Sequence, residues 1–169
     1  MPSGKPVDPE KIRQRMASLC ARSEQCESDI RTKIRRAGIF PDKEQEIIDF
    51  LMEHRFLDNA RFARAFASDK VRFSGWGRIK IRNALLMKRI PSDLIDEAIG
   101  GVEESDYEAA ILSAARAKSR GLDLSQRDDA MKLCRHLASR GFEPSLCISM
   151  MKRMRLEQKQ QQESLTEEE

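Results

Sequence analysis

The chain has 169 residues, of which 35% are charged and only 5% are aromatic, and its formal net charge is +3. This charge-rich balance is unusual for a compact enzyme. No run of eighteen apolar residues offers a membrane span, and residues 1–7 lack the apolar stretch of a signal peptide, so we expect a soluble, cytoplasmic protein.

The first part of the chain, residues 9–55, is predicted to form three helices after a flexible N-terminus at residues 1–8. Apolar residues recur with a 3.6-residue period and no stretch alternates with period two, which predicts an all-α fold. Ser23 is expected to cap a second helix that stops at Gly38. Pro41 opens a third helix, whose expected inner face is Ile47, Ile48, Leu51 and Met52.

A second three-helix repeat is predicted at residues 56–101, where Asp58 is a good N-cap. Gly75 lies in the break before the second helix of this repeat, which runs to about Arg89. We interpret an aromatic stripe on its first helix as packed core rather than as a base-stacking platform, and we expect Ile79 to join it in holding the repeat together. The stripe consists of Phe62, Phe66 and Phe73.

The third repeat is predicted at residues 102–156, with helices that end at Gly121 and Gly141 and a last helix that follows Pro144. The remaining segment, residues 157–169, is polar, glutamine-rich and acidic. Such a composition predicts a disordered tail.

One pattern connects the three predicted repeats. Apolar residues at i and i+4 precede a helix-ending position at i+8 and a large apolar residue, at intervals of 51 and 52 residues. The copies are Ile30, Ile34, Gly38, Ile39; Ile81, Leu85, Arg89, Ile90; and Leu133, Leu137, Gly141, Phe142. A fixed period of this size predicts tandem units that cover one another's apolar faces. Such an array presents surface along its length, which favours a binding function.

Positive charge is concentrated in residues 59–90, which contain nine Lys/Arg and the single acid Asp69. A solvated basic face is the ordinary interpretation of such a run. However, an excess that no local acid neutralises favours an anionic partner. The predicted contact residues are Arg61, Lys70, Arg72, Arg78, Arg82, Lys88 and Arg89.

No motif indicates catalysis, a cofactor or a metal. The histidines, His54 and His136, have no recognisable nucleophile partner, and no P-loop is present. Cys134 and His136 alone cannot complete a tetrahedral zinc shell. The four cysteines form no C-x-x-C pair, so we expect buried, reduced thiols.

The segment Leu57-Asp58-Asn59-Ala60-Arg61-Phe62-Ala63, followed by Gly75-Trp76-Gly77-Arg78-Ile79, resembles the RecX family of bacterial regulators of the RecA recombinase. The resemblance covers roughly residues 10–155. Asn59 replaces the second acid of the family motif. Arg89 stands where the family usually has Gly, and a left-handed conformation there would cost about 1 kcal/mol.

The resemblance implies an elongated, curved tandem array of three three-helix repeats, here a monomer. It also implies binding in the groove of the RecA–DNA filament across neighbouring subunits, and inhibition of RecA's ATPase, strand exchange and coprotease activities. Two other interpretations stay open. One is a stand-alone, non-specific DNA-binding protein that uses Arg78, Lys80 and Arg82 at a helix start. The other is a helical-repeat scaffold for a different acidic partner.

Overall fold

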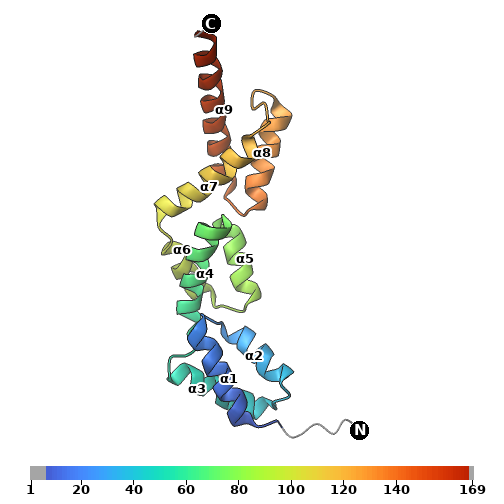
Figure 1. Ribbon diagram of the computed structural model, residues 1–169, viewed down its shortest axis with the longest axis vertical. Coiled ribbons are helices and arrows are strands. Elements are labelled where there is room, and N and C mark those ends of the chain that lie inside the picture. The colour runs from blue at the N-terminus through green and yellow to red at the C-terminus, as the bar shows by residue number, and fades with distance from the viewer. Residues whose placement is uncertain (1–6, 168–169) are drawn as a thin grey trace, which may run out of the picture. The chain divides into compact units, whose positions relative to one another are not determined.

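The computed structural model describes residues 7–167, and this part of the chain forms nine α-helices and no strand (Figure 1). The all-α prediction is confirmed. The helices are α1 (Pro9–Arg22), α2 (Glu27–Arg36), α3 (Pro41–Glu53), α4 (Asn59–Ser74), α5 (Arg78–Met87), α6 (Ser92–Gly100), α7 (Glu104–Ser119), α8 (Arg127–Ser139) and α9 (Pro144–Glu167). None of the helices in residues 7–167 has the length and apolar character that a membrane crossing needs.

The chain divides into two compact units. The first contains the residues up to Phe66 together with Leu85–Gly100, and the second contains Ala67–Ala84 together with the residues from Gly101 onward. The helix bounds are compatible with three groups of three helices. The predicted repeat boundaries, between residues 55 and 56 and between residues 101 and 102, stay a prediction.

The core of the first unit is built from one face of each of its first three helices. It comprises Ile12, Met16 and Cys20 of α1, Ile30 and Ile34 of α2, and Ile47, Ile48 and Leu51 of α3. Met52, predicted to lie inward, is 38% exposed because α3 turns its neighbour Leu51 to the core.

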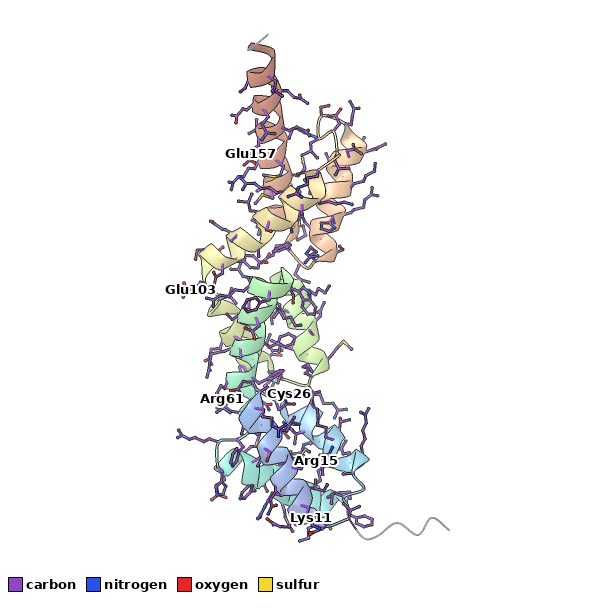
Figure 2. All side chains as sticks on the ribbon, viewed as in Figure 1. Lys11, Arg15, Cys26, Arg61, Glu103 and Glu157 are labelled. Carbon is purple, nitrogen blue, oxygen red and sulfur yellow. The ribbon has the colours of Figure 1, made fainter. Side chains whose placement is uncertain are left out.

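The predicted N-cap of α2 was wrong. Ser23 instead ends α1 as its C-cap, and α2 begins four residues later with the buried Cys26 at the N-cap position (Figure 2). Cys26 makes no capping hydrogen bond with its side chain. The Asn59 side chain supplies one, since its Oδ1 accepts from the Glu27 amide at 3.0 Å while its Nδ2 donates to the Glu27 carboxylate at 3.3 Å. An aspartate at residue 59 could accept the first bond but not donate the second.

The three marker positions of the sequence period end their helices in the same way. Gly38, Arg89 and Gly141 all have positive φ, at 84°, 58° and 91°. In each copy this residue's amide bonds back three residues and the next amide bonds back five, as with Ile39 to Ile34 at 3.4 Å. These pairs of bonds are Schellman motifs, and the apolar residues that flank them are buried. Arg89 therefore adopts the left-handed geometry at the cost expected for a side chain there.

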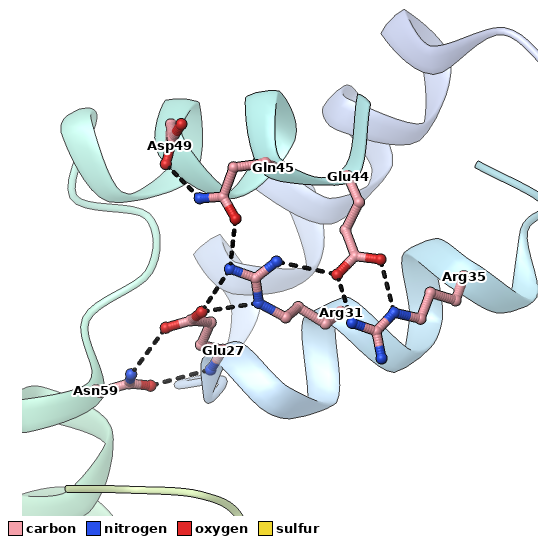
Figure 3. Close-up of polar contacts among 7 residues, drawn as sticks. All are labelled: Glu27, Arg31, Arg35, Glu44, Gln45, Asp49 and Asn59. Carbon is pink, nitrogen blue, oxygen red and sulfur yellow. Dashed lines mark hydrogen bonds and ion pairs between the residues drawn. The ribbon is translucent and has the colours of Figure 1, made fainter. Parts of the chain in front are cut away.

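A buried carboxylate connects α2 to α3 in the first unit (Figure 3). Glu44 is 3% exposed, yet both of its oxygens accept hydrogen bonds from Arg35, at 2.7 and 2.8 Å, and Arg31 adds a third at 2.9 Å. The Arg35 hydrogen bonds, acting against desolvation and aided by Arg31, lower the pKa of Glu44. The paired charges make this burial tolerable.

Two members of the predicted middle-repeat core do not lie in a core. Phe73 is 82% exposed and Ile79 is 44% exposed, whereas Phe62 is buried and Phe66 is half-buried. The buried line of α4 runs through Ala63, Ala67 and Val71, so its centre is rotated away from the aromatic stripe. Phe73 lies in the last turn of α4, beyond the end of this line.

The predicted disordered tail was wrong for most of its length, because α9 continues to Glu167. Gln158 anchors this extension within the second unit. Its side chain donates to the Leu122 carbonyl and accepts from the Leu124 amide, both at 2.8 Å. Residues 168–169 lie outside the described residues, as do residues 1–6 of the predicted flexible N-terminus. Asp8, its last residue, is the N-cap of α1.

Candidate partner-binding surface

The positive charge of residues 59–90 is neutralised to a large extent within the protein. At least five of its nine cations form ion pairs with acids from other parts of the sequence. The pairs are Arg61–Glu24 (2.5 Å), Arg64–Glu97 (3.0 Å), Arg72–Asp106 (2.6 Å), Arg78–Glu104 (2.7 Å) and Lys88–Asp29 (2.7 Å). The count of unneutralised charge made from the sequence was therefore too high for this segment.

Arg61, the arginine of the first motif, lies against the chain that leads into α4. Asp58 caps this helix by accepting from the Arg61 amide at 2.9 Å. The Arg61 guanidinium contacts Glu24 and donates to the carbonyl oxygens of Arg55 and Phe56 at 3.2 and 3.4 Å. The motif thus fixes the loop between α3 and α4, and the charge of Arg61 is satisfied locally.

Arg78, the arginine of the second motif, lies over the ring of Tyr107, with its central guanidinium carbon 3.9 Å from the ring centroid. It contacts Glu104 at 2.7 Å and Glu143 at 3.5 Å. Tyr107 is fully buried and donates its hydroxyl proton to Glu143 at 2.6 Å. Burial, with this hydrogen bond, raises the pKa of Tyr107. Arg78 therefore connects the start of α5 to Glu104, Tyr107 and Glu143 within the second unit.

The backbone at the start of α5 is also occupied. The amides of Gly77 and Ile79 donate to the carbonyls of Arg140 and Gly141 at 2.8 and 3.0 Å, and the Arg78 amide donates to the Tyr107 hydroxyl at 3.0 Å. Helix N-termini normally leave such amides unsatisfied. A Cβ on Gly77 would lie 2.2 Å from backbone atoms of Gly141, so the two segments meet at glycine.

Two lysines of the same unit lie against one aromatic ring. The ammonium groups of Lys70 and Lys80 lie 4.7 and 4.6 Å from the ring centroid of Trp76. A cation over an aromatic face keeps its full charge, and the contact limits its movement. Residues 70–80 therefore present two positioned positive charges on one half-buried tryptophan.

The remaining predicted contact residues differ in their surroundings. Lys88 is half-buried, and its hydrogen bond to Asp29 lowers the pKa of that carboxyl against the effect of partial burial. Arg82 is half-buried and Arg89 is exposed. Within residues 7–167 no three His, Cys, Asp or Glu side chains gather so as to hold a metal ion.

Comparison with known proteins gives the chain its family. A family model described as "RecX, second three-helix domain" matches residues 58–99. The "Regulatory protein RecX" of Prosthecochloris aestuarii is 32% identical over 120 residues, which cover 71% of this chain and 78% of the relative. The chain belongs to the RecX family.

Another relative agrees with this assignment, and two solved structures show the same fold. "Regulatory protein RecX" of Clostridium botulinum (strain Eklund 17B) is 30% identical over 135 residues, and the chain spans 63% of that relative's length. A crystal structure of regulatory protein RecX has a TM-score of 0.74 at 21% identity, covering 85% of this chain and 71% of the other. The crystal structure of RecX from Lactobacillus salivarius has a TM-score of 0.76 at 16% identity, and the match covers 88% of this chain and 97% of that one. Both structures share the fold.

The residues that satisfy Arg78 were not found from the sequence. Glu104 lies 26 positions away and Glu143 lies 65 positions away, and neither belongs to a motif. No motif connected Tyr107, the chain's only tyrosine, with Arg78. No local signal connects such distant residues, because their meeting depends on how α7 and α8 pack.

Proposed function

We propose that this chain binds the RecA–DNA filament, in its groove and across neighbouring subunits, and lowers RecA's ATPase, strand-exchange and coprotease activities. The observation that supports this most directly is the 32% identity with the "Regulatory protein RecX" of P. aestuarii. The motifs around Asp58 and Gly75 support it further. We also propose that the chain acts in the cytoplasm as a monomer, by binding rather than by catalysis.

The contact that we propose in the second unit is the cluster of Lys70, Trp76 and Lys80. Its two ammonium groups are positioned over the indole ring. A filament that carries a DNA backbone attracts such groups electrostatically. Arg89, which is exposed, keeps its proposed role, and Arg82 stays a predicted contact residue.

Four further residues of the predicted surface receive a supporting role in this proposal. Arg61, Arg72, Arg78 and Lys88 each contact an acid of this chain. A partner could use these charges only by displacing that acid. We therefore propose that these four residues shape the surface.

The alternative of a helix-turn-helix DNA-binding protein is disfavoured at the start of α5. Of the side chains that this alternative uses, Arg78 already contacts Glu104 and Glu143, and a helix N-terminus can bind phosphate through its backbone only where amides are unsatisfied. The amides of Gly77, Arg78 and Ile79 all donate to groups of this chain. A scaffold for another acidic partner would not need free amides at the start of α5. An experiment must therefore distinguish this scaffold from the proposed RecA regulator.

The test is RecA's DNA-dependent ATPase rate during titration with this chain, below and up to equimolar amounts at fixed salt. The wild type should inhibit at concentrations too low to coat the DNA. The variant K70Q/K80Q should require roughly 2- to 30-fold more protein, because each exposed ion pair contributes about 0.2–1 kcal/mol. The control R135Q/K152Q removes two exposed cations elsewhere in the second unit and should inhibit like the wild type.

Each other result has a definite meaning. Equal inhibition by K70Q/K80Q and wild type would reject the proposed contact but not the function. No inhibition by the wild type, with measurable binding to naked DNA, would favour a nucleic-acid-binding module. If the wild type neither inhibited the RecA ATPase nor bound naked DNA, the scaffold for another acidic partner would be the remaining interpretation.

A further inference from the structure

A basic groove lies between α1 and α2 in the first unit, outside the segment discussed above. It has a volume of about 670 Å³, and the described residues that line it include four cations and no acid. Arg15 and Arg22 come from α1, and Lys33 and Arg36 come from α2. Figure 2 labels Arg15 on α1.

The acids of these two helices and of their connecting loop are engaged elsewhere. Glu10 pairs with Arg13, Glu24 with Arg61, Glu27 with Arg31, and Asp29 with Lys88. Among the described residues, no side-chain hydrogen bond or ion pair involves Arg15, Arg22, Lys33 or Arg36. The groove therefore keeps four cations that form no ion pair within the described residues, and of these Lys33 acts at longer range on Asp29, whose pKa it helps to lower.

The two faces of α2 show how this arises. Arg31 and Arg35 point to α3, where Glu44 accepts from both (Figure 3). Lys33 and Arg36 line the groove on the side of α1, which contributes no acid to it. One helix thus carries a neutralised face and an unneutralised face.

The spacing of the four cations follows the groove. Arg15 and Arg22 are seven residues apart, which places them on one face of α1 and about 10 Å apart along its axis. Lys33 and Arg36 are three residues apart, about one turn of α2. Between these rims the lining is mostly apolar, with Ser18 as its polar residue, and includes the buried Met16 and the half-buried Leu19. Two cationic rims therefore border an apolar floor over about two helical turns.

We propose that the α1–α2 groove docks an acidic, amphipathic helical segment of a partner protein. An apolar stripe on such a helix covers the floor, and its flanking carboxylates reach the two rims, as in other helix-in-groove complexes. A nucleic-acid backbone would satisfy the rims but would offer the floor only sugar and phosphate. This site is independent of the proposed filament contact at Lys70 and Lys80, and its test does not use RecA.

The experiment measures fluorescence anisotropy of a labelled 15-residue peptide on titration with the full chain. The peptide carries Leu at positions 4, 7, 8 and 11, and Glu at most others. Two rim variants, R15Q/R36Q and R22Q/K33Q, remove separate cation pairs from exposed positions. The control R135Q/K152Q removes the same charge from the second unit. Circular dichroism checks that every variant is folded.

We expect each rim variant to bind the peptide at least 10-fold more weakly and the control to change affinity less than 2-fold. A peptide with Gln in place of Leu should also bind at least 10-fold more weakly to the wild type. Unchanged affinity in both rim variants overturns the proposal. Equal binding of the Gln peptide overturns it as well, because the floor then plays no part. A single-stranded oligonucleotide of equal charge that binds more tightly than the Leu peptide, and is lost in the rim variants, assigns the groove to nucleic acid instead.

Discussion

Arginines at the start of α5 and arginines along the α1–α2 groove look alike in the sequence but have different surroundings. Arg78 contacts Glu104, Glu143 and the ring of Tyr107. Arg15 lines a groove to which no acid of residues 7–167 contributes. The comparison teaches that a run of positive charge does not by itself define a binding surface. A cation is available to a partner only where the fold does not place an acid of the same chain beside it.

The largest expected effect tests how tightly the start of α5 is built. Gly141→Ala would place a Cβ 2.3 Å from that of Lys80 at a φ of 91°. Overpacking and left-handed strain should together cost about 2–5 kcal/mol, lowering Tm by roughly 5–15 °C. Gly38→Ala is the matched control, since φ is 84° but the nearest contact is an ordinary 3.7 Å.

Strain alone should make Gly38→Ala cost about 1 kcal/mol, or roughly 2–4 °C. Thermal unfolding followed by circular dichroism measures both variants. If the two variants lowered Tm equally, the close approach of the loop after α8 to α5 would not be a source of stability.

The next prediction compares the two kinds of arginine directly. Arg78→Gln removes two carboxylate contacts and the stacking on Tyr107, and should cost about 1.5–3 kcal/mol, or roughly 4–8 °C in Tm. Arg15→Gln removes an exposed side chain without an ion pair and should change stability by less than about 0.5 kcal/mol. Comparable losses in thermal unfolding would contradict the distinction between the two sites.

The smallest effect concerns the neutralised face of α2. The pKa of Glu44 is lowered from its ordinary 4.5, so the folded state gains stability from its ionised form. That gain is fully present above about pH 4.5 and is lost as the pH falls through the lowered pKa. Glu44→Gln should therefore have a Tm a few degrees below that of the wild type at pH 7, corresponding to about 1–2 kcal/mol.

At pH 3 this difference between Glu44→Gln and the wild type should shrink. Other carboxylates with lowered pKa values, such as Asp123 and Asp129, are present in both proteins and cancel in the comparison. Thermal unfolding at several pH values gives the result. A difference in Tm that stays constant from pH 7 to pH 3 would mean that the charge of Glu44 is not what stabilises the contact.

Several helix ends could be predicted because their chemistry is local. Pro41 opens α3, Asp58 caps α4, and Gly38 and Gly141 end α2 and α8 with positive φ. The error at Ser23 shows the limit of such reasoning. The amide of the first residue of α2 is satisfied by Asn59, which lies 32 residues away. Capping patterns in the sequence involve only neighbouring residues and cannot predict this contact.

The candidate site was less predictable than the fold. Lys70 and Lys80 were both counted in the basic segment, but their common contact with Trp76 could not be inferred from residue spacing alone. The cations of the α1–α2 groove were not singled out. The two helices and their connecting loop also carry acids, and only the contacts of Glu24 and Asp29 with other residues show that these carboxylates do not pair with the groove cations.

The sequence by itself determined most of the helices and the helix ends at Gly38 and Gly141, because these depend on residues within one or two turns of each other. It also determined the period of 51 and 52 residues and the family motifs, which are read directly from residue identities. The tertiary structure alone decided which charges are neutralised, since Arg78 and Glu143 meet across 65 positions. It also decided that Phe73 is exposed, because the packing of α4 selects its buried face. Helix formation is governed by short-range hydrogen bonds and sterics, whereas the electrostatic character of a surface depends on how distant segments pack.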